Sequence, residues 1–306
     1  MKILGIESSC DDTSLSIVDN NKNIIANEVL SQNNIHEHYN GIVPELAARN
    51  HVLYIDKILK KILLEHNLNI KDIGLISATA GPGLIGGLLI GLTFAKTLAQ
   101  MNNIPFIGIN HLEGHALTAR LTNNIEFPFL LLLASGGHTN FYFISGIRKY
   151  IYLGGTLDDA LGEAFDKIAN ILNLGFPGGA EVEKIAKVGN PLSVDLPKPL
   201  INKKNLDMSF SGLKTAVLKK TLSSQYGTKF NASDIAASFQ KTIADILSKK
   251  VSLAIDYCEE KDYLFQNIVL SGGVAANEYL RDRISVIANK YKKKLCLPPR
   301  SLCTDN

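Results

Sequence analysis

The stretch that decides the fold is "IGLISATAGPGLIGGLLIGLTFAKTLAQ", residues 73–100. An apolar run ends in closely spaced glycines, and a second apolar run of helical length follows, which predicts a strand, a tight turn and a helix. The stretch "QNIVLSGGVAANEYLRDRISVIANK", residues 266–290, has the same order. A chain that contains this unit twice is predicted to be an α/β protein.

The elements around these two stretches also repeat. Periodicity predicts strands at 2–8, 13–19 and 23–30 and a helix from Pro44 to 66, and in the second half strands at 127–135, 139–145 and 149–155 and helices over 157–172 and 233–260. Both halves read strand, strand, strand, helix, strand, helix, strand. We therefore expect two similar lobes, 1–110 and 111–306, around a ligand cleft, the second with a helical insertion. One large irregular α/β domain is the alternative.

Composition narrows the function classes. The chain has 306 residues, 46% of them hydrophobic, and a net charge of +3. No apolar run reaches the ~20 residues of a membrane helix. The four cysteines lack metal or disulfide spacing, which predicts a reducing, cytoplasmic setting. The charge permits an acidic partner but is too modest for tight nucleic-acid binding by this chain alone.

Three glycine-rich turns suit phosphate. They are "TAGPG" (79–83), "ASGGHT" (134–139) and "LSGGVAAN" (270–277). Glycines there expose backbone N–H groups, and a helix start adds partial positive charge, so a nucleotide is the expected ligand. In the helix over 157–172, Asp158 or Asp159 is expected to cap the N-terminus or to interact with the helix dipole, whereas Asp166 lies too far along for capping and is expected to accept ribose hydroxyls.

"INHLEGHALTAR" (109–120) contains two histidines four residues apart. On a helix His111 and His115 project about 40° apart, which suits a metal, whereas Glu113 lies about 200° from His111 and is badly placed to activate water. This spacing disfavours a zinc peptidase. A third ligand is needed, and Asp305, after the last predicted strand, would complete a two-histidine, one-carboxylate set suited to iron or zinc.

Ten motifs resemble a known family in their order along the chain. They are "GIESSCDDTS", "GIVPELAARNH", "TAGPGLIGGLLIG", "NHLEGHALTAR", "LASGGHT", "GEAFDK", "FPGG", "SFSGLKTA", "SGGVAAN" and "LCTDN". This order is similar to that of the tRNA threonylcarbamoyladenosine transferases, the TsaD family, once described as glycoprotein endopeptidases. Ser8 and Asp12 stand where the family usually has threonine and glutamate, and family members continue past "CTDN" with a further helical segment.

The resemblance implies a duplicated actin/Hsp70-like (ASKHA) ATPase fold and transfer of threonylcarbamoyl from threonylcarbamoyl-AMP to the adenine amine of the adenosine 3′ of the anticodon, in tRNAs that read codons beginning with A. It implies one divalent metal, iron or alternatively zinc, and as partners tRNA, a TsaB-like paralogue and a TsaE-like small ATPase. By position, the implied metal ligands are His111, His115 and Asp305. The implied nucleotide contacts are Leu133, Ala134, Ser135, Gly136, Gly137, Asp166, Gly179, Glu183 and Asn277.

The expected mechanism is acyl transfer at the carbamoyl carbon, with a metal stabilising the oxyanion and AMP leaving. No Ser-His-Asp or Cys-His nucleophile is evident, and the general base is unidentified. The alternatives are a metallo-glycoprotein endopeptidase and a nucleotide-binding scaffold without catalysis.

Overall fold

Two compact units make up the chain. The structure, a computed structural model, describes residues 1–39, 41–225 and 231–304. The units are Met1–Leu117 and Thr118–Thr304, and the division falls within helix α4 (His111–Thr122), whose first residue is the expected start of the second lobe. Within the described ranges, no helix is long and apolar enough to cross a membrane.

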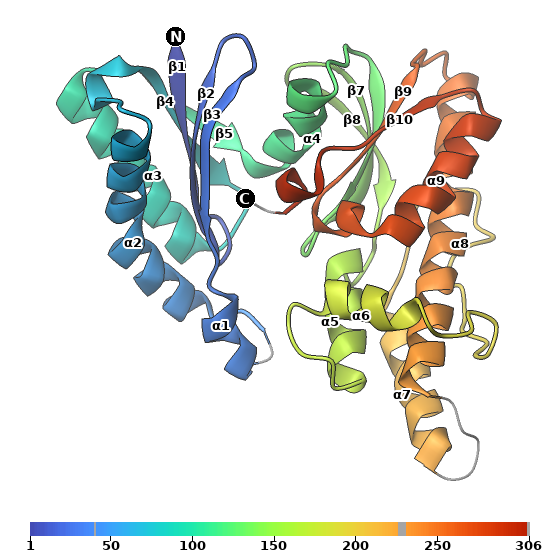
Figure 1. The fold of residues 1–306 in the computed structure, drawn as a ribbon. Coiled ribbons are helices and arrows are strands. Elements are labelled where there is room, and N and C mark those ends of the chain that lie inside the picture. The colour runs from blue at the N-terminus through green and yellow to red at the C-terminus, as the bar shows by residue number, and fades with distance from the viewer. Residues whose placement is uncertain (40, 226–230, 305–306) are drawn as a thin grey trace. The chain divides into compact units, whose positions relative to one another are not determined.

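The first unit is a five-stranded sheet with two long helices against it (Figure 1). Its strands are β1 (Lys2–Glu7), β2 (Thr13–Asp19), β3 (Ile24–Leu30), β4 (Ile73–Gly81) and β5 (Phe106–Asn110), in the order β3-β2-β1-β4-β5. Its helices are α1 (Asn33–His36), α2 (Pro44–Glu65), α3 (Ile85–Asn102) and the first half of α4. β1 is antiparallel to β2 and parallel to β4.

The core of this unit follows from its sequence periods. Leu4 and Ile6 on β1 alternate with residues of the other face, and on α2 buried Ile55, Ile58 and Ile62 recur three to four residues apart. Pro44 occupies the first turn of α2, as predicted, because its missing N–H has no helical partner there.

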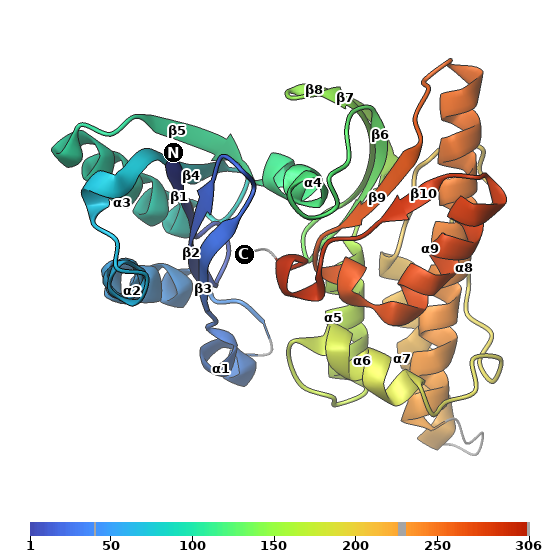
Figure 2. The same cartoon turned by 45° about the horizontal axis from the view of Figure 1, so that its top comes forward.

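The second unit is also a five-stranded sheet. Its strands are β6 (Phe129–Ala134), β7 (Thr139–Gly146), β8 (Lys149–Gly155), β9 (Asn267–Ser271) and β10 (Lys294–Cys296), in the order β10-β9-β6-β7-β8. Its helices are α5 (Leu161–Ile171), α6 (Gly178–Ala186), α7 (Ser211–Gln225), α8 (Ala232–Glu260) and α9 (Glu278–Lys290). Figure 2 shows α8 and α9 side by side, and they pack against each other.

The predicted duplication is confirmed. Replacing each strand of the first sheet by its counterpart five strands later turns β3-β2-β1-β4-β5 into β8-β7-β6-β9-β10, the observed order of the second sheet. The directions also match, since β6 is antiparallel to β7 and parallel to β9. The insertion that carries α6 and α7 is confined to the second unit.

One local prediction was wrong. The helix expected over 157–172 begins at Leu161, and its N-cap residue Ala160 makes no side-chain capping bond. Asp158 instead turns toward the start of α7, where its carboxylate accepts from the backbone N–H groups of Phe210 (2.8 Å) and Ser211 (3.2 Å). Asp159 pairs with Lys167 at 2.7 Å. Sequence spacing favoured the nearer helix, but the chain bends so that Asp158 caps the distant one.

The environment of Asp158 changes its titration. Partial burial would raise the pKa of this carboxyl, but hydrogen bonds from Ser209, Phe210 and Ser211 outweigh it and lower the pKa to about 2. Asp158 therefore stays ionised well below neutral pH and holds the insertion to the end of β8.

Candidate functional site

A cavity of about 310 Å³ lies in the second unit beside α5 and α6. Its lining residues are Gly136, Gly162, Phe165, Asp166, Pro177, Gly179, Ala180, Glu183, Gly273, Val274, Ala276, Asn277 and Thr304. The volume is at the lower end of the range for small-molecule sites. Five of the nine residues predicted to contact a nucleotide line it: Gly136, Asp166, Gly179, Glu183 and Asn277.

Three helix N-termini converge on this cavity. Gly162 lies in the first turn of α5, Gly179 lies in the first turn of α6, and Asn277 is the N-cap residue of α9. Helix N-termini carry unsatisfied N–H groups and partial positive charge, which favour phosphate. None of the lining residues is lysine or arginine, so attraction for an anion comes here from the backbone.

The predicted loop 133–137 contributes mainly by shaping the cavity. Leu133 and Ala134 are buried in β6, and the carbonyl of Ser135 accepts from the N–H of Gly162 at 3.1 Å. A Cβ at position 162 would lie 2.7 Å from that carbonyl oxygen, so only glycine allows α5 to start this close to the loop. Of the loop residues, Gly136 lines the cavity and Gly137 does not.

Polar side chains fix the cavity wall. Asp166 on α5 accepts from the N–H of Gly178 at 2.8 Å and so joins α5 to α6. Asn277 accepts from the N–H of Leu280 at 3.0 Å and donates to Gln240 at 2.9 Å. These bonds hold a carboxylate and an amide at the cavity in defined positions, where they can accept or donate hydrogen bonds to a sugar or base.

Five apolar lining residues were not predicted: Phe165, Pro177, Ala180, Val274 and Ala276. Phe165 is fixed by an edge-to-face contact with Phe239, with ring centroids 5.1 Å apart. Such residues offer apolar surface to a flat ring. Their periodicity is that of core residues, so the sequence carries no signal that separates them from the core.

The glycine-rich turn at 79–83 belongs to the first unit and does not line this cavity of the second unit. In the first unit, a Cβ on Gly83 would lie 2.6 Å from Ser9, and one on Gly87 would lie 2.1 Å from the carbonyl oxygen of Ser8. The hydroxyl of Ser8 also donates to the carbonyl of Gly87 at 2.9 Å. These glycines let α3 pack on the turn between β1 and β2.

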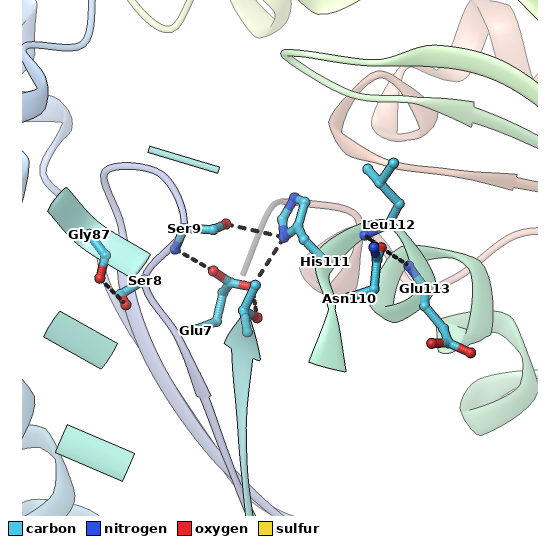
Figure 3. Close-up of polar contacts among 9 residues, drawn as sticks. Glu7, Ser8, Ser9, Gly87, Asn110, His111, Leu112 and Glu113 are labelled. Carbon is cyan, nitrogen blue, oxygen red and sulfur yellow. Dashed lines mark hydrogen bonds and ion pairs between the residues drawn. The ribbon is translucent and has the colours of Figure 1, made fainter. Parts of the chain in front are cut away.

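The histidine pair lies at the start of α4. His111 and His115 are buried, and their ring centroids are 4.7 Å apart, so both project from one face as the spacing predicted. The side chain of Asn110, at the end of β5, accepts from the N–H groups of Leu112 and Glu113 and so starts the helix at His111. Figure 3 shows the Glu113 carboxylate pointing away from the His111 ring.

Glu7, which the sequence analysis missed, holds the His111 ring (Figure 3). Its Oε2 atom lies 3.1 Å from His111 Nδ1, and it also accepts from the Ser9 N–H and the Thr79 hydroxyl. Burial alone would raise the pKa of the Glu7 carboxyl, but the hydrogen bonds from these three residues and the charge of His111 outweigh burial and hold that pKa below its ordinary value. The available signal was a charged residue at the end of an apolar first strand.

These residues fit one part of a metal site. Donation from His111 Nδ1 to a carboxylate leaves the lone pair of the neutral ring on Nε2, which is the usual arrangement around a metal-binding histidine. Among the residues that the structure describes, no three His, Cys, Asp or Glu side chains meet in an arrangement that could hold a metal. The expected third ligand, Asp305, lies outside the described residues.

Comparison with known proteins gives one consistent family. The family model "TsaD: tRNA N6-adenosine threonylcarbamoyltransferase" matches residues 23–306. The tRNA N6-adenosine threonylcarbamoyltransferase of Rickettsia conorii is 56% identical over all of this chain and 90% of that protein. Those of Rickettsia rickettsii and Rickettsia bellii are each 54% identical with the same coverage.

Solved structures agree on the fold. Full-length HypF in a phosphate- and nucleotide-bound form superposes on 99% of this chain and 53% of its own with a TM-score of 0.63 at 12% identity. Component A of the Acidaminococcus fermentans (R)-2-hydroxyglutaryl-CoA dehydratase superposes on 98% of this chain and 92% of its own with a TM-score of 0.54 at 14% identity. The predicted ASKHA-type fold is confirmed. Because the TsaD family model matches residues 23–306 and the Rickettsia proteins match the whole chain, the chain belongs to the TsaD family of tRNA N6-adenosine threonylcarbamoyltransferases.

Proposed function

We propose that this chain transfers a threonylcarbamoyl group from threonylcarbamoyl-AMP to the N6 amine of the adenosine 3′ of the anticodon, in tRNAs that read codons beginning with A. The observation that carries the proposal is the cavity of the second unit, on which three helix N-termini converge beside the Asp166 carboxylate. The helix N-termini and this carboxylate suit an adenylate. The family match indicates threonylcarbamoyl as the acyl group and tRNA as its acceptor.

The adenylate is placed by its chemistry. The backbone N–H groups near Gly136 and Gly179 bind its phosphate, Asp166 accepts from ribose hydroxyls, and the apolar wall at Phe165 and Val274 contacts the adenine. Glu183, whose carboxylate accepts from the N–H of Glu278 at 2.7 Å, fixes the start of α9 and completes the polar rim. Leu133, Ala134, Ser135 and Gly137 act through the shape of the loop.

His111, His115 and Asp305 would hold one divalent cation, iron in our proposal and zinc as the alternative. When bound, that cation supplies Lewis-acid stabilisation of charge on the carbamoyl oxygen. Glu7 keeps the His111 ring in the orientation and tautomer that coordination requires. It is a positioning residue.

The bond changes balance without a covalent enzyme intermediate. The N6 amine of adenosine forms a bond to the carbamoyl carbon, the bond from that carbon to the phosphate oxygen breaks, AMP leaves with the electron pair, and the amine loses one proton. The general base for that proton is not assigned to a residue. The helix N-termini around the cavity stabilise the negative charge of the departing AMP.

Partners and setting are part of the proposal. A TsaB-like paralogue and a TsaE-like ATPase would act with this chain in the cytoplasm. The α2 and α3 helices pack together and expose apolar side chains, namely Val52, Leu53, Ile85 and Leu89, which supports a protein partner on that face of the first unit. The thiols of Cys258, Cys296 and Cys303 are buried and free, which suits a reducing compartment.

Nucleoside mass analysis tests the function. The chain is incubated with tRNA, threonine, bicarbonate, ATP and the candidate partner proteins. The tRNA is then digested and the masses of its nucleosides are measured. We expect threonylcarbamoyladenosine from the unaltered chain, none from His111→Ala or His115→Ala, and unchanged product from His66→Ala, which alters an exposed histidine elsewhere. Full product from both paired-histidine variants would remove the metal site from the mechanism.

The two alternatives make different predictions. A metallopeptidase would cleave a glycoprotein in a chelator-sensitive way, but the orientation of Glu113 argues against it, as does the family match. A scaffold without catalysis would bind nucleotide and form no modified adenosine even with the partners present.

A further inference from the structure

Strand β8 is the outer edge of the second sheet and exposes large side chains. The strand order β10-β9-β6-β7-β8 leaves one side of β8 without a neighbouring strand, as Figure 2 shows. Tyr152 is 57% exposed and Ile147, in the hairpin turn before β8, is 62% exposed. Exposed aromatic and aliphatic residues gathered on an edge strand mark an interaction surface.

The aromatic part of this surface is held in place. Tyr142 on β7 lies directly opposite Tyr152 in the strand register, and their ring centroids are 5.6 Å apart at 62°. The side chain of Asn140 donates to the Tyr142 hydroxyl at 3.3 Å. Tyr152 is therefore exposed and yet oriented by its neighbour. The Tyr152 side chain consequently loses little conformational entropy when a base stacks on it.

Cations are exposed in the two segments that adjoin the ends of β8. Arg148 and Lys149 are exposed at the hairpin turn that leads into β8. At the other end, the segment 203–208 runs along the end of β8, where Met208 donates to the carbonyl of Gly155 at 2.8 Å. This segment exposes Lys203 and Lys204.

A buried lysine fixes that segment. Lys250 of α8 is fully buried, and its ammonium donates to the carbonyls of Lys203 (3.2 Å) and Asn205 (2.8 Å). Because the buried ammonium of Lys250 hydrogen-bonds to these two carbonyls, it fixes the backbone that carries the two exposed lysines.

Charge selects the class of partner. Residues 1–117 contain 8 Lys and Arg against 11 Asp and Glu, whereas residues 118–304 contain 24 against 17. The modest net charge of the chain thus conceals a basic second unit. A polyanion with flat rings matches a basic surface that presents an oriented tyrosine, and single-stranded RNA has both features.

The surface is near the cavity within the same unit. β7 begins at Thr139, directly after the loop that contains Gly136, and the carbonyl of Thr139 accepts from the N–H of Thr156 just past β8. Tyr142 is three residues further along β7, roughly 10 Å at strand spacing. A base on Tyr152 and the adenosine that approaches the adenylate in the cavity can therefore belong to one short single-stranded segment.

We propose that the β8 edge, defined by Arg148, Lys149, Tyr152, Lys203 and Lys204, binds the single-stranded anticodon loop of the tRNA, with one base stacked on Tyr152 and the cations on flanking phosphates. The proposal rests on the proposed function for the identity of the RNA. It assigns to this chain a docking surface for nucleotides adjacent to the modified adenosine.

Binding of a labelled anticodon stem-loop RNA to the full chain tests the proposal. Tyr152→Ala should weaken binding about tenfold, whereas Tyr152→Phe, which keeps the ring, should stay within twofold. Tyr257→Ala is the matched control, because Tyr257 is an exposed tyrosine near a lysine on α8. The double variant Lys203→Gln/Lys204→Gln should reduce the slope of log K against log salt by about 1.4. Unchanged affinity in Tyr152→Ala overturns the proposal.

A stacking reporter separates the possible partners. The chain has no tryptophan, so Tyr152→Trp introduces the single one. Its fluorescence should be quenched by the stem-loop RNA and not by a fully paired duplex, and Tyr257→Trp should respond to neither. Quenching by a partner protein instead of RNA would make the edge a protein interface and overturn the proposal. If the unaltered chain binds RNA through Tyr152 and yet forms no threonylcarbamoyladenosine, the proposed reaction fails and the RNA surface stands.

Discussion

The two units have the same strand order but use the glycines after their fourth strands in different ways. After β4, Gly83 and Gly87 are in contact with the backbone of Ser8 and Ser9, so α3 packs directly on the turn between β1 and β2. After β9, Gly273 has no atom within 4 Å of a built Cβ, and it lines the cavity. The glycines after β4 therefore serve close packing, whereas the turn after β9 combines close packing of Gly272 on Ala134 with ligand access at Gly273.

The turns opposite these glycines explain the difference. In the first unit the turn after β1 carries Ser8 and Ser9, whose side chains and carbonyls contact α3 and the His111 ring. In the second unit the corresponding turn after β6 carries Gly136 and Gly137, neither of which has an atom within 4 Å of a built Cβ. The lack of side chains at Gly136 and Gly137 leaves space in the second unit. In the first unit Ser8 and Ser9 fill the corresponding space.

The largest effect on stability should come from replacing a closely packed glycine of the first unit with alanine. Gly87→Ala places a Cβ 2.1 Å from the Ser8 carbonyl oxygen, and this overlap should lower the free energy of unfolding by roughly 3 kcal/mol. Gly273→Ala, in the turn after β9, meets no atom within 4 Å and should leave stability within about 0.5 kcal/mol while weakening nucleotide binding. Urea denaturation and nucleotide titration measure the two quantities. Equal loss of stability in both variants would show that the units do not differ in this way.

The next effect concerns the histidine pair of the first unit. Glu7→Gln removes the negative charge beside His111 Nδ1, and we expect metal affinity to fall about 10- to 100-fold. Glu113→Gln is the matched control, because it alters a carboxylate on the same helix that points away from the ring. Metal content after dialysis against a competing chelator measures the affinity. A Glu7→Gln chain that retains as much metal as the control would exclude the positioning role.

The sequence predicted the repeated topology because the periods of strands and helices recur in both halves, and tertiary packing agrees with them. It also predicted the His111–His115 face, since helical spacing alone determines it. Predictions failed where local spacing competes with long-range contacts. Asp158 stands at a plausible capping distance from α5, yet its partners are more than 50 residues away, at the start of α7.

The candidate site was predicted unevenly for a related reason. Gly136 and Asn277 stand out because glycine and asparagine near helix starts form turns and caps and can bind ligands, and Asp166 stands out because it lies too far along its helix for capping to explain it. Phe165 and Val274 do not stand out, because an apolar residue at a cavity wall has the same period as one in the core. Glu7 was missed because its role depends on a histidine 104 residues away.

The smallest effect concerns the insertion, which only the second unit has. The pKa of Asp158 is lowered to about 2, below the ordinary value of about 3.9 that it regains on unfolding. A depressed carboxyl pKa stabilises the fold fully above the unfolded pKa, and that contribution is lost as the pH falls from about 4 to about 2. Because Asp158 is partly exposed to solvent, we expect the loss to be about 1 kcal/mol or less. Unfolding free energies measured across this range should fall less steeply in Asp158→Asn, while Asp195→Asn, an exposed aspartate elsewhere in the insertion, should follow the unaltered chain. If Asp158→Asn and the unaltered chain have the same acid slope, Asp158 does not anchor the insertion electrostatically, and the neutral hydrogen bonds to Phe210 and Ser211 suffice to hold α7 in place.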